Sequence, residues 1–205
     1  MPDQIDRLSA NELRAALGQC TIGREIIILE ETTSTNDSIL QRVASSTREG
    51  LVILAERQTA GRGQRHNRWE STAYKGLWFS ILLRPPQIPV AQSARLTTWA
   101  AQTVAQTIVA EFSLPVTIKS PNDVYVNGKK IAGVLVEMRA QKNTAHFVVL
   151  GIGINDNHRT EDFSKDLSEL AASLAMVLNR DIDRSRLAVA LLRNLDRSYN
   201  QFRGL

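Results

Sequence analysis

The sequence predicts an α+β fold in which helices pack on a largely antiparallel sheet. Three observations carry this prediction. Strand-like apolar segments dominate the middle of the chain, the dipeptide Asn127-Gly128 marks a two-residue hairpin turn, and amphipathic helical patterns occupy the C-terminal end. Apolar residues make up 43% of the chain and charged residues 22%, which excludes a generally disordered protein.

The expected strands are short apolar runs bounded by polar or turn residues. They are residues 25–29, 51–55, 76–83, 124–126, 131–138 and 147–154. Because Asn and Gly readily adopt positive φ angles, Asn127-Gly128 predicts that segments 124–126 and 131–138 form a hairpin. The helices expected to pack on this sheet are predicted from helical periodicity and capping residues.

Helical periodicity predicts four helices. Leu96, Ala100, Val104 and Ile108 recur every fourth residue, which predicts one buried face of a long helix between Pro89 and Phe112. Ser34 or Thr35 is expected to cap a helix over residues 36–45. Amphipathic patterns predict two further helices over residues 167–178 and 186–202.

The chain is expected to form a single domain over residues 1–205, with residues 1–24 as a lead-in, because no repeat or linker divides it. Its formal charge of +4 points to anionic partners without separating nucleotides, acidic proteins and nucleic acids. Cys20 is the only cysteine, so no internal disulfide can form. No export signal or membrane-length apolar run is evident, and we expect a cytoplasmic protein without a membrane partner.

Four polar clusters fall at strand ends or turns, where a sheet can present side chains to one cleft. The first, residues 31–36, offers hydroxyls and an amide to a small polar ligand, although a helix N-cap accounts for Ser34 equally well. The second, residues 55–69, combines two glycines with several arginines and suits a nucleotide phosphate. It matches neither the P-loop nor the dinucleotide pattern, and a solvated basic loop is the alternative.

The third and fourth clusters lie around the expected hairpin and at the end of the last strand. Residues 119–137 include Lys129 and Lys130, of which one is expected to point inward, where a buried lysine needs an anion. Two solvated hairpin lysines are the alternative. Residues 151–157 place glycines before amides able to bond a base or ribose, although tight packing at a sheet end also explains the glycines.

These clusters resemble the catalytic domain of biotin protein ligases. The resemblance rests on four motifs that match the family in order and spacing, from about Glu25 to the C-terminus: Ser34-Thr35-Asn36, Gly61-Arg62-Gly63 through Trp69, Pro121-Asn122-Asp123 through Lys130, and Gly151 through Asn155. The resemblance implies a mixed sheet backed by helices, like that of class II aminoacyl-tRNA synthetases. It also implies ATP-dependent adenylation of biotin and transfer of biotin to a lysine of a biotin carboxyl carrier protein.

The resemblance further assigns site residues. Those implied for biotin are Ser34, Thr35, Asn36, Gln58, Gly61, Arg62, Gly63, Gln64, Lys130 and Gly133. Those implied for ATP are Trp69, Asn122, Asp123, Ile154 and Asn155, with Asp123 near Mg²⁺. Lys130, Arg62 and Asp123 are the expected catalytic residues.

The chemistry supports cationic roles independently of the resemblance. A biotin carboxylate has to approach an anionic α-phosphate to within about 3–3.5 Å before a bond forms. Positive charge must offset the repulsion between these two groups, and Lys130 and Arg62 are the available cations. Mg²⁺ on the phosphates would add to this stabilisation.

The chain departs from the family pattern in several places. Gln64 stands where many relatives carry arginine, which removes a charge near the adenylate unless Arg65 or Arg68 substitutes. Ser120 stands where many carry tryptophan, so the nucleotide pocket is expected to differ in shape. The small β domain that most relatives carry after the catalytic one is not expected within this sequence. No helix-turn-helix segment is evident before Glu25, so we expect no DNA partner. The sequence leaves open whether the protein forms a homodimer.

Three alternatives compete with the ligase hypothesis. Lipoate ligation ranks below it because the Arg-Arg-x-Ser-Gly-Gly-Gly segment of those enzymes is missing. A non-catalytic sensor of biotin or adenylate is motivated by Gln64, Ser120 and the missing tail. A nucleic-acid-binding module is motivated by the basic charge and the arginines between Arg57 and Arg68, and would bind with strong salt dependence.

Overall fold

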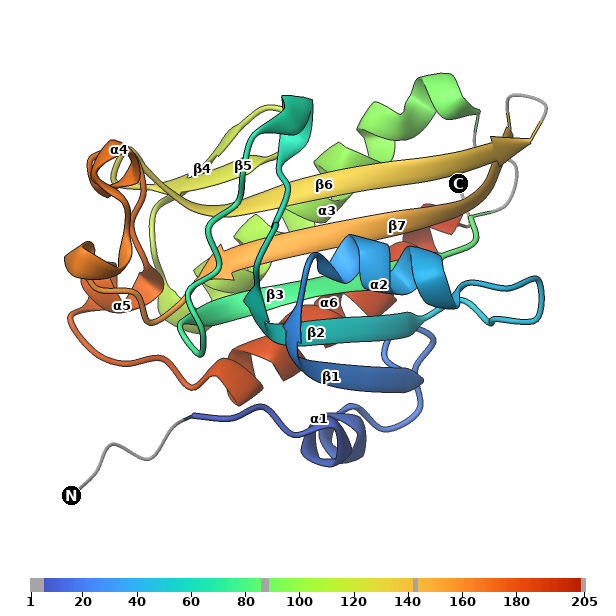
Figure 1. The fold of residues 1–205 in the computed structure, drawn as a ribbon, viewed down its shortest axis with the longest axis horizontal. Coiled ribbons are helices and arrows are strands. Elements are labelled where there is room, and N and C mark those ends of the chain that lie inside the picture. The colour runs from blue at the N-terminus through green and yellow to red at the C-terminus, as the bar shows by residue number, and fades with distance from the viewer. Residues whose placement is uncertain (1–5, 86–88, 142–143, 204–205) are drawn as a thin grey trace.

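The computed structural model describes residues 6–85, 89–141 and 144–203, and it is built on one seven-stranded sheet (Figure 1). The strand order is β1-β2-β3-β7-β6-β5-β4, in which β1 and β2 are parallel and every other neighbouring pair is antiparallel. The strands are β1 (Glu25–Thr32), β2 (Leu51–Gln58), β3 (Gly76–Leu83), β4 (Val116–Lys119), β5 (Asp123–Val126), β6 (Lys129–Gln141) and β7 (Thr144–Asn155). The expected mixed, largely antiparallel sheet is confirmed.

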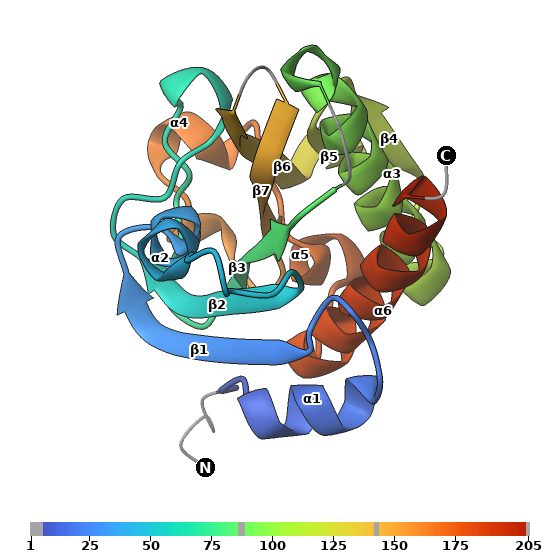
Figure 2. The ribbon, with the colours of Figure 1, turned by 90° about the vertical axis from the view of Figure 1, so that its right-hand side faces the viewer.

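Helices cover the two faces of the sheet unequally (Figure 2). On one face lie α1 (Ala10–Leu17), α3 (Ser93–Phe112) and α6 (Arg184–Arg203), and α6 contacts both α1 and α3. On the other face, α2 (Thr35–Arg42) packs over β2, β3 and β7. The short helices α4 (Lys165–Ser168) and α5 (Leu174–Leu178) follow β7. On the face of the sheet that carries α2, the area beside this helix is therefore available for a binding site.

The alternation of side chains along each strand builds a core on both faces. On β2, Val52 and Leu54 belong to the large core under α3 and α6, whereas Leu51 and Ile53 belong to a smaller core under α2. On β7, Phe147 and Val149 continue that smaller core, and glycines then take over the same face. This change from bulky residues to glycine hollows the second face toward the end of β7.

The hairpin predicted at Asn127-Gly128 is confirmed. Both residues have positive φ, 51° and 77°, and they connect β5 to β6. The periodic helix predicted before Phe112 is also confirmed as α3, with Leu96, Ala100, Val104 and Ile108 all buried. Among the described residues, no helix is long and apolar enough to cross a membrane.

The single helix predicted over residues 167–178 is wrong. The segment between α4 and α5 is extended because its backbone bonds to β6: Lys130 N donates to Leu170 O, and Ala172 N donates to Lys130 O. Ser173 then starts α5, and its hydroxyl accepts a bond from Met176 N. A long-range pairing of this kind overrides an amphipathic pattern.

Other boundaries differ in smaller ways. The helix predicted over residues 36–45 begins at Thr35 and ends at Arg42. The last helix, predicted over residues 186–202, spans Arg184–Arg203 as α6. The sequence indicated neither β4 nor α1, which lies within the predicted lead-in. The assignment of residues 1–205 to one domain stays a prediction, and residues 1–5, 86–88, 142–143 and 204–205 lie outside the described part of the chain.

Candidate functional site

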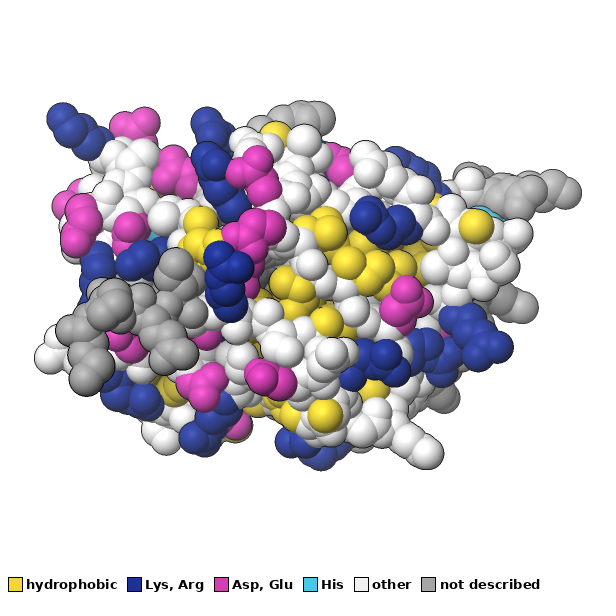
Figure 3. All heavy atoms as spheres, turned by 60° about the horizontal axis from the view of Figure 1, so that its bottom comes forward, with side chains coloured by type: hydrophobic (Ala, Val, Ile, Leu, Met, Phe, Trp, Pro, Cys, Tyr) yellow, Lys and Arg dark blue, Asp and Glu magenta, His cyan; other side chains and the backbone are white. Residues whose placement is uncertain are grey.

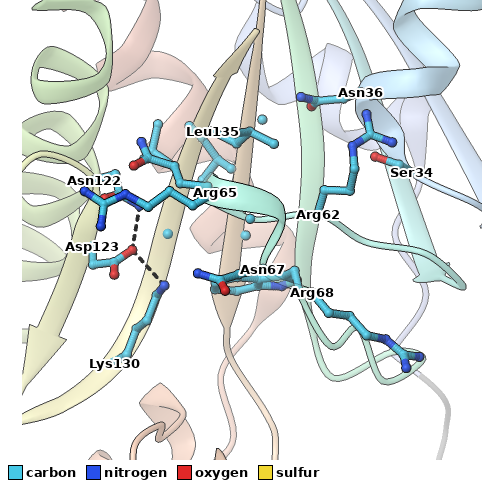
Figure 4. A pocket seen from close by; sticks show the side chains of 18 of the residues that line it. Ser34, Asn36, Arg62, Arg65, Asn67, Arg68, Asn122, Asp123, Lys130 and Leu135 are labelled. Carbon is cyan, nitrogen blue, oxygen red and sulfur yellow. Dashed lines mark hydrogen bonds and ion pairs between the residues drawn. The ribbon is translucent and has the colours of Figure 1, made fainter. Parts of the chain in front are cut away.

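A cavity of about 320 Å³ opens on the face of the sheet beside α2 (Figure 4). Its walls come from the start of α2, the loop over residues 61–69 after β2, and the segment between β4 and β5, with β6 and β7 beneath. All four polar clusters of the sequence contribute to it. Twelve predicted site residues line it: Ser34, Thr35, Asn36, Gln58, Arg62, Gly63, Gln64, Trp69, Asn122, Asp123, Lys130 and Gly133.

Two facing glycines form the floor of the cavity under Trp69. Gly133 of β6 pairs with Gly153 of β7. A Cβ atom on Gly133 would lie 2.8 Å from the Trp69 ring, and one on Gly153 would lie 2.6 Å from it. These distances are shorter than van der Waals contact, so only glycine lets the indole lie this close to the sheet. The floor is thus shaped by backbone and by one aromatic ring.

A β-bulge aims Lys130 into the cavity. In the pairing of β5 with β6, Tyr125 is opposite Lys130 and Val124 is opposite Ala132, which leaves Ile131 as an extra residue. With strict alternation Lys130 and Gly133 would lie on opposite faces, but the extra residue brings both to the cavity. Of the two hairpin lysines, only Lys130 lines this cavity.

The Lys130 ammonium has the anionic partner expected of a partly buried lysine. Its Nζ lies 2.7 Å from Oδ1 of Asp123, and the side chains are 28% and 21% exposed. Asn122 Nδ2 donates to the same oxygen at 2.7 Å. Lys130 Nζ also lies 5.2 Å from the centroid of the Trp69 ring, within reach of a cation–π interaction. Lys130 and Asn122 thus both engage the same oxygen of the Asp123 carboxylate.

Arg62 is held at the α2 end of the cavity by two carboxylates. Its guanidinium donates two parallel bonds to Asp37, at 2.5 and 2.7 Å, and a third at 3.3 Å to Glu137. The hydrogen bond with Asp37 raises the pKa of Arg62 above its usual range, against the opposing effect of burial. Asn36 Nδ2 donates to the same Glu137 carboxylate at 2.6 Å. The loop is thereby tied to both α2 and β6.

Gln58 organises the start of α2. Its Oε1 accepts bonds from Thr35 N at 2.9 Å and Thr35 Oγ1 at 3.2 Å, while its Nε2 donates to Ser71 Oγ at 2.9 Å. Ser34 occupies the N-cap position but makes no side-chain capping bond, and it lines the cavity. The capping explanation of Ser34 is therefore not supported, and its buried hydroxyl faces the cavity.

Three predicted site residues lie outside the cavity. Gly61 packs against Trp69 O, where an added Cβ would come within 2.6 Å. Ile154 is fully buried in the large core, and Asn155 Nδ2 donates to Ala172 O at 3.1 Å. The structure gives these residues packing and positioning roles, and their assignments to biotin and ATP stay predictions.

Charged side chains are mixed on the face seen in Figure 3, where basic and acidic groups are interspersed around an apolar area. Over the described residues of that face, no broad, uniformly basic surface appears. Nucleic-acid binding proteins concentrate positive charge on one face, so this view gives the nucleic-acid alternative no support.

Comparisons with known proteins agree with the geometry. The pattern that defines the Biotin/lipoate A/B protein ligase family matches residues 28–155. The chain belongs to this family. It is 35% identical over 196 residues to the bifunctional ligase/repressor BirA of Bacillus spizizenii, and 35% identical over 184 residues to the biotin--[acetyl-CoA-carboxylase] ligase of Mycobacterium tuberculosis. These matches cover 96% and 88% of the chain, and 60% and 66% of the two relatives.

The fold is that of biotin protein ligase catalytic domains, with the class II aminoacyl-tRNA synthetase-like sheet that the resemblance implied. The biotin protein ligase from Aquifex aeolicus, solved in complex with biotin and ATP, superposes with a TM-score of 0.75 and 29% identity. The superposition covers 88% of this chain and 72% of that chain. The chain spans about 60% of the length of its first BirA relatives.

Two carboxylates at the site escaped the sequence analysis. Asp37 and Glu137 hold Arg62, yet neither was singled out. Glu137 could have been predicted to lie at the site, because residues 133, 135 and 137 of β6 point to the same face of the sheet. Asp37 follows the first polar cluster directly, but only the folded loop brings Arg62 to it.

The glycine floor yields a prediction. Replacing Gly153 with alanine is expected to displace Trp69, because the new methyl group would overlap its ring. We expect the free energy of unfolding to fall by about 1–3 kcal/mol, as for other overpacked sites. Urea unfolding of the wild type and the variant measures this loss.

Gly63→Ala is the matched control for stability. Gly63 also lines the cavity, but its φ of −110° suits any residue and an added Cβ would meet its nearest neighbour, Asn67 O, at 3.4 Å. Equal stability losses in the two variants would contradict the role given to Gly153.

Proposed function

We propose that the chain is an ATP-dependent biotin protein ligase. It forms biotinyl-5'-AMP from biotin and ATP, and then transfers biotin to a lysine of a biotin carboxyl carrier protein such as that of acetyl-CoA carboxylase. The observation that carries the proposal is the convergence of an arginine-bearing loop and Lys130 on one cavity. Family membership and the named activities of the relatives support it.

In the first step a biotin carboxylate oxygen attacks the α-phosphorus of ATP. An oxygen–phosphorus bond forms, the bond to the β-phosphate breaks, and pyrophosphate leaves with the electron pair. The cavity volume lies within the range of small-molecule sites, about 300–1,000 Å³. Lys130 would stabilise the negative charge that builds up between the carboxylate and the phosphate. Ser34, Thr35 and Gln58 would bond the neutral end of biotin.

In the second step the neutral amine of the acceptor lysine attacks the acyl carbon. The carbon–oxygen bond to AMP breaks, AMP leaves, and the amine loses a proton as the amide forms. The loop over residues 61–69 covers one side of the cavity and would keep water from the mixed anhydride. The acceptor engages from the open side.

Mg²⁺ enters this proposal with ATP. The described residues contain no group of three or more His, Cys, Asp or Glu side chains able to hold a metal. Mg²⁺ is commonly bound by one or two carboxylates together with substrate phosphates. Asp123 fits this pattern, because Lys130 and Asn122 both bond its Oδ1, and among the described residues no bond engages its Oδ2. A cytoplasmic location is part of the same proposal.

One experiment tests both steps. The protein is incubated with biotin, MgATP and a biotin carboxyl carrier domain, and the carrier is weighed by mass spectrometry. We expect the carrier to gain the mass of one biotinyl group, and to lose that gain when its acceptor lysine is replaced by arginine. An unmodified carrier after incubation with folded protein would contradict the proposal.

A further inference from the structure

The two cations expected to act on the reacting acids are already paired in the cavity. Arg62 is bound by Asp37 and Glu137, and Lys130 is bound by Asp123. Each pairing offsets positive charge that would otherwise face an incoming ligand. An acyl-adenylate carries a phosphate, so additional positive charge is needed where that phosphate lies.

Arg65 supplies a cation without such a partner. It lines the cavity, and none of the ion pairs among the described residues engages its guanidinium. Figure 4 shows its side chain extended from the loop toward the side where Asn122 and Asp123 lie. Arg62 turns instead toward Asn36, and Arg68 points away from Asp123 and Lys130.

The backbone of Arg65 is unusual for an arginine. Its φ of 56° and ψ of 35° lie in the left-handed region, which a residue other than glycine rarely adopts. The preceding residue, Gln64, brings a neutral amide to the cavity. A strained residue at a cavity points to a functional constraint, and here the constraint accompanies a charged side chain.

We propose that Arg65 holds the α-phosphate of the acyl-adenylate, in place of the charge that position 64 does not provide. This inference rests on the proposed function and deepens it. The planar guanidinium can donate two parallel bonds to phosphate oxygens, which an amide or an ammonium cannot match. Arg65 therefore sets how long the reactive intermediate stays in the site.

The test measures release of the intermediate. The protein is loaded with biotin and ATP labelled at the α-phosphate, desalted, and diluted into excess unlabelled ligands while bound label is followed. Arg65→Gln is expected to release the adenylate about 10- to 100-fold faster than the wild type, because a charged hydrogen bond is lost. Arg65→Lys is expected to fall between them, since it keeps the charge without the fork.

Arg68→Gln is the matched control. It removes the same charge from the same loop, but the Arg68 guanidinium is directed away from Asp123 and Lys130, so release is expected within about twofold of the wild type. Adding Gln64→Arg to Arg65→Gln is expected to slow release again, because it returns a guanidinium to the neighbouring position.

Three outcomes would overturn the inference. In the first, Arg65→Gln releases adenylate at the wild-type rate. In the second, Arg65→Gln and Arg68→Gln accelerate release equally, which would show a general effect of loop charge. In the third, the wild type forms no adenylate, and that result overturns the proposed function itself, whereas the first two leave the ligase activity intact.

Discussion

Replacing Lys130 with alanine is expected to lower the rate of biotin-dependent ATP–pyrophosphate exchange by about 100-fold or more. Lys130 reaches the cavity through the β-bulge, and its ammonium lies 2.7 Å from the Asp123 carboxylate and 5.2 Å from the centroid of the Trp69 ring. Without it, the repulsion between the carboxylate of biotin and the α-phosphate is not offset at this side of the cavity. Exchange of labelled pyrophosphate into ATP measures the loss.

Lys129→Ala is the matched control for this prediction. Lys129 is the neighbouring residue of the same hairpin, and its Nζ donates to Ser168 O at 3.2 Å outside the cavity. We expect its exchange rate to remain within about twofold of the wild type, because its ammonium is bonded to Ser168 O and does not line the cavity. A folded Lys130→Ala variant that exchanges pyrophosphate at the wild-type rate would contradict a role for the Lys130 ammonium in the reaction.

Replacing Arg184 with alanine is expected to cause a large loss of stability. Arg184 begins α6 and is fully buried. Its Nη1 lies 2.8 Å from Oε2 of Glu56 and 3.1 Å from Gly76 O, and its Nη2 donates to Asp6 O. Glu56 is only 3% exposed. Removing the guanidinium leaves that carboxylate buried without its partner, which costs about 3–5 kcal/mol of unfolding free energy.

A control variant and a double variant test the reason given for this loss of stability. Arg186→Ala removes a guanidinium from the same helix, but its ion pair with Glu111 is 75% exposed on the arginine side, so its loss is expected to cost about 0–1 kcal/mol. The double variant Arg184→Met with Glu56→Leu is expected to recover much of the stability, because no uncompensated charge remains. Equal midpoints of urea unfolding for Arg184→Ala and Arg186→Ala would contradict this account.

Local patterns predicted most of the fold. Asn127-Gly128 fixed the hairpin because few dipeptides tolerate two positive φ angles, and the spacing of Leu96 through Ile108 identified α3 because one of its faces is buried. The failure at residues 167–178 has a different cause. Ala171 forms a bridge with Lys130, and a pairing between residues so far apart in the chain leaves no local periodic signal.

The candidate site also contains residues that were predicted and residues whose role depends on the folded structure. Twelve predicted residues line one cavity, because the polar clusters at strand ends and turns pointed to it and the family resemblance assigned the individual residues. The bulge at Ile131, which sends Lys130 and Gly133 to one side, depends on register and could not be read from the residues. The same limit applies to Asp37 and Glu137, whose role appears only when the loop carrying Arg62 folds over α2.

We expect this cavity to join a carboxylate to the α-phosphate of ATP. The most direct measurement is pyrophosphate exchange by the wild-type protein with MgATP, in the presence and absence of biotin. We expect labelled pyrophosphate to be incorporated into ATP only when biotin is present, and this incorporation to disappear with Lys130→Ala. A folded wild-type protein that binds biotin but exchanges no pyrophosphate would contradict it.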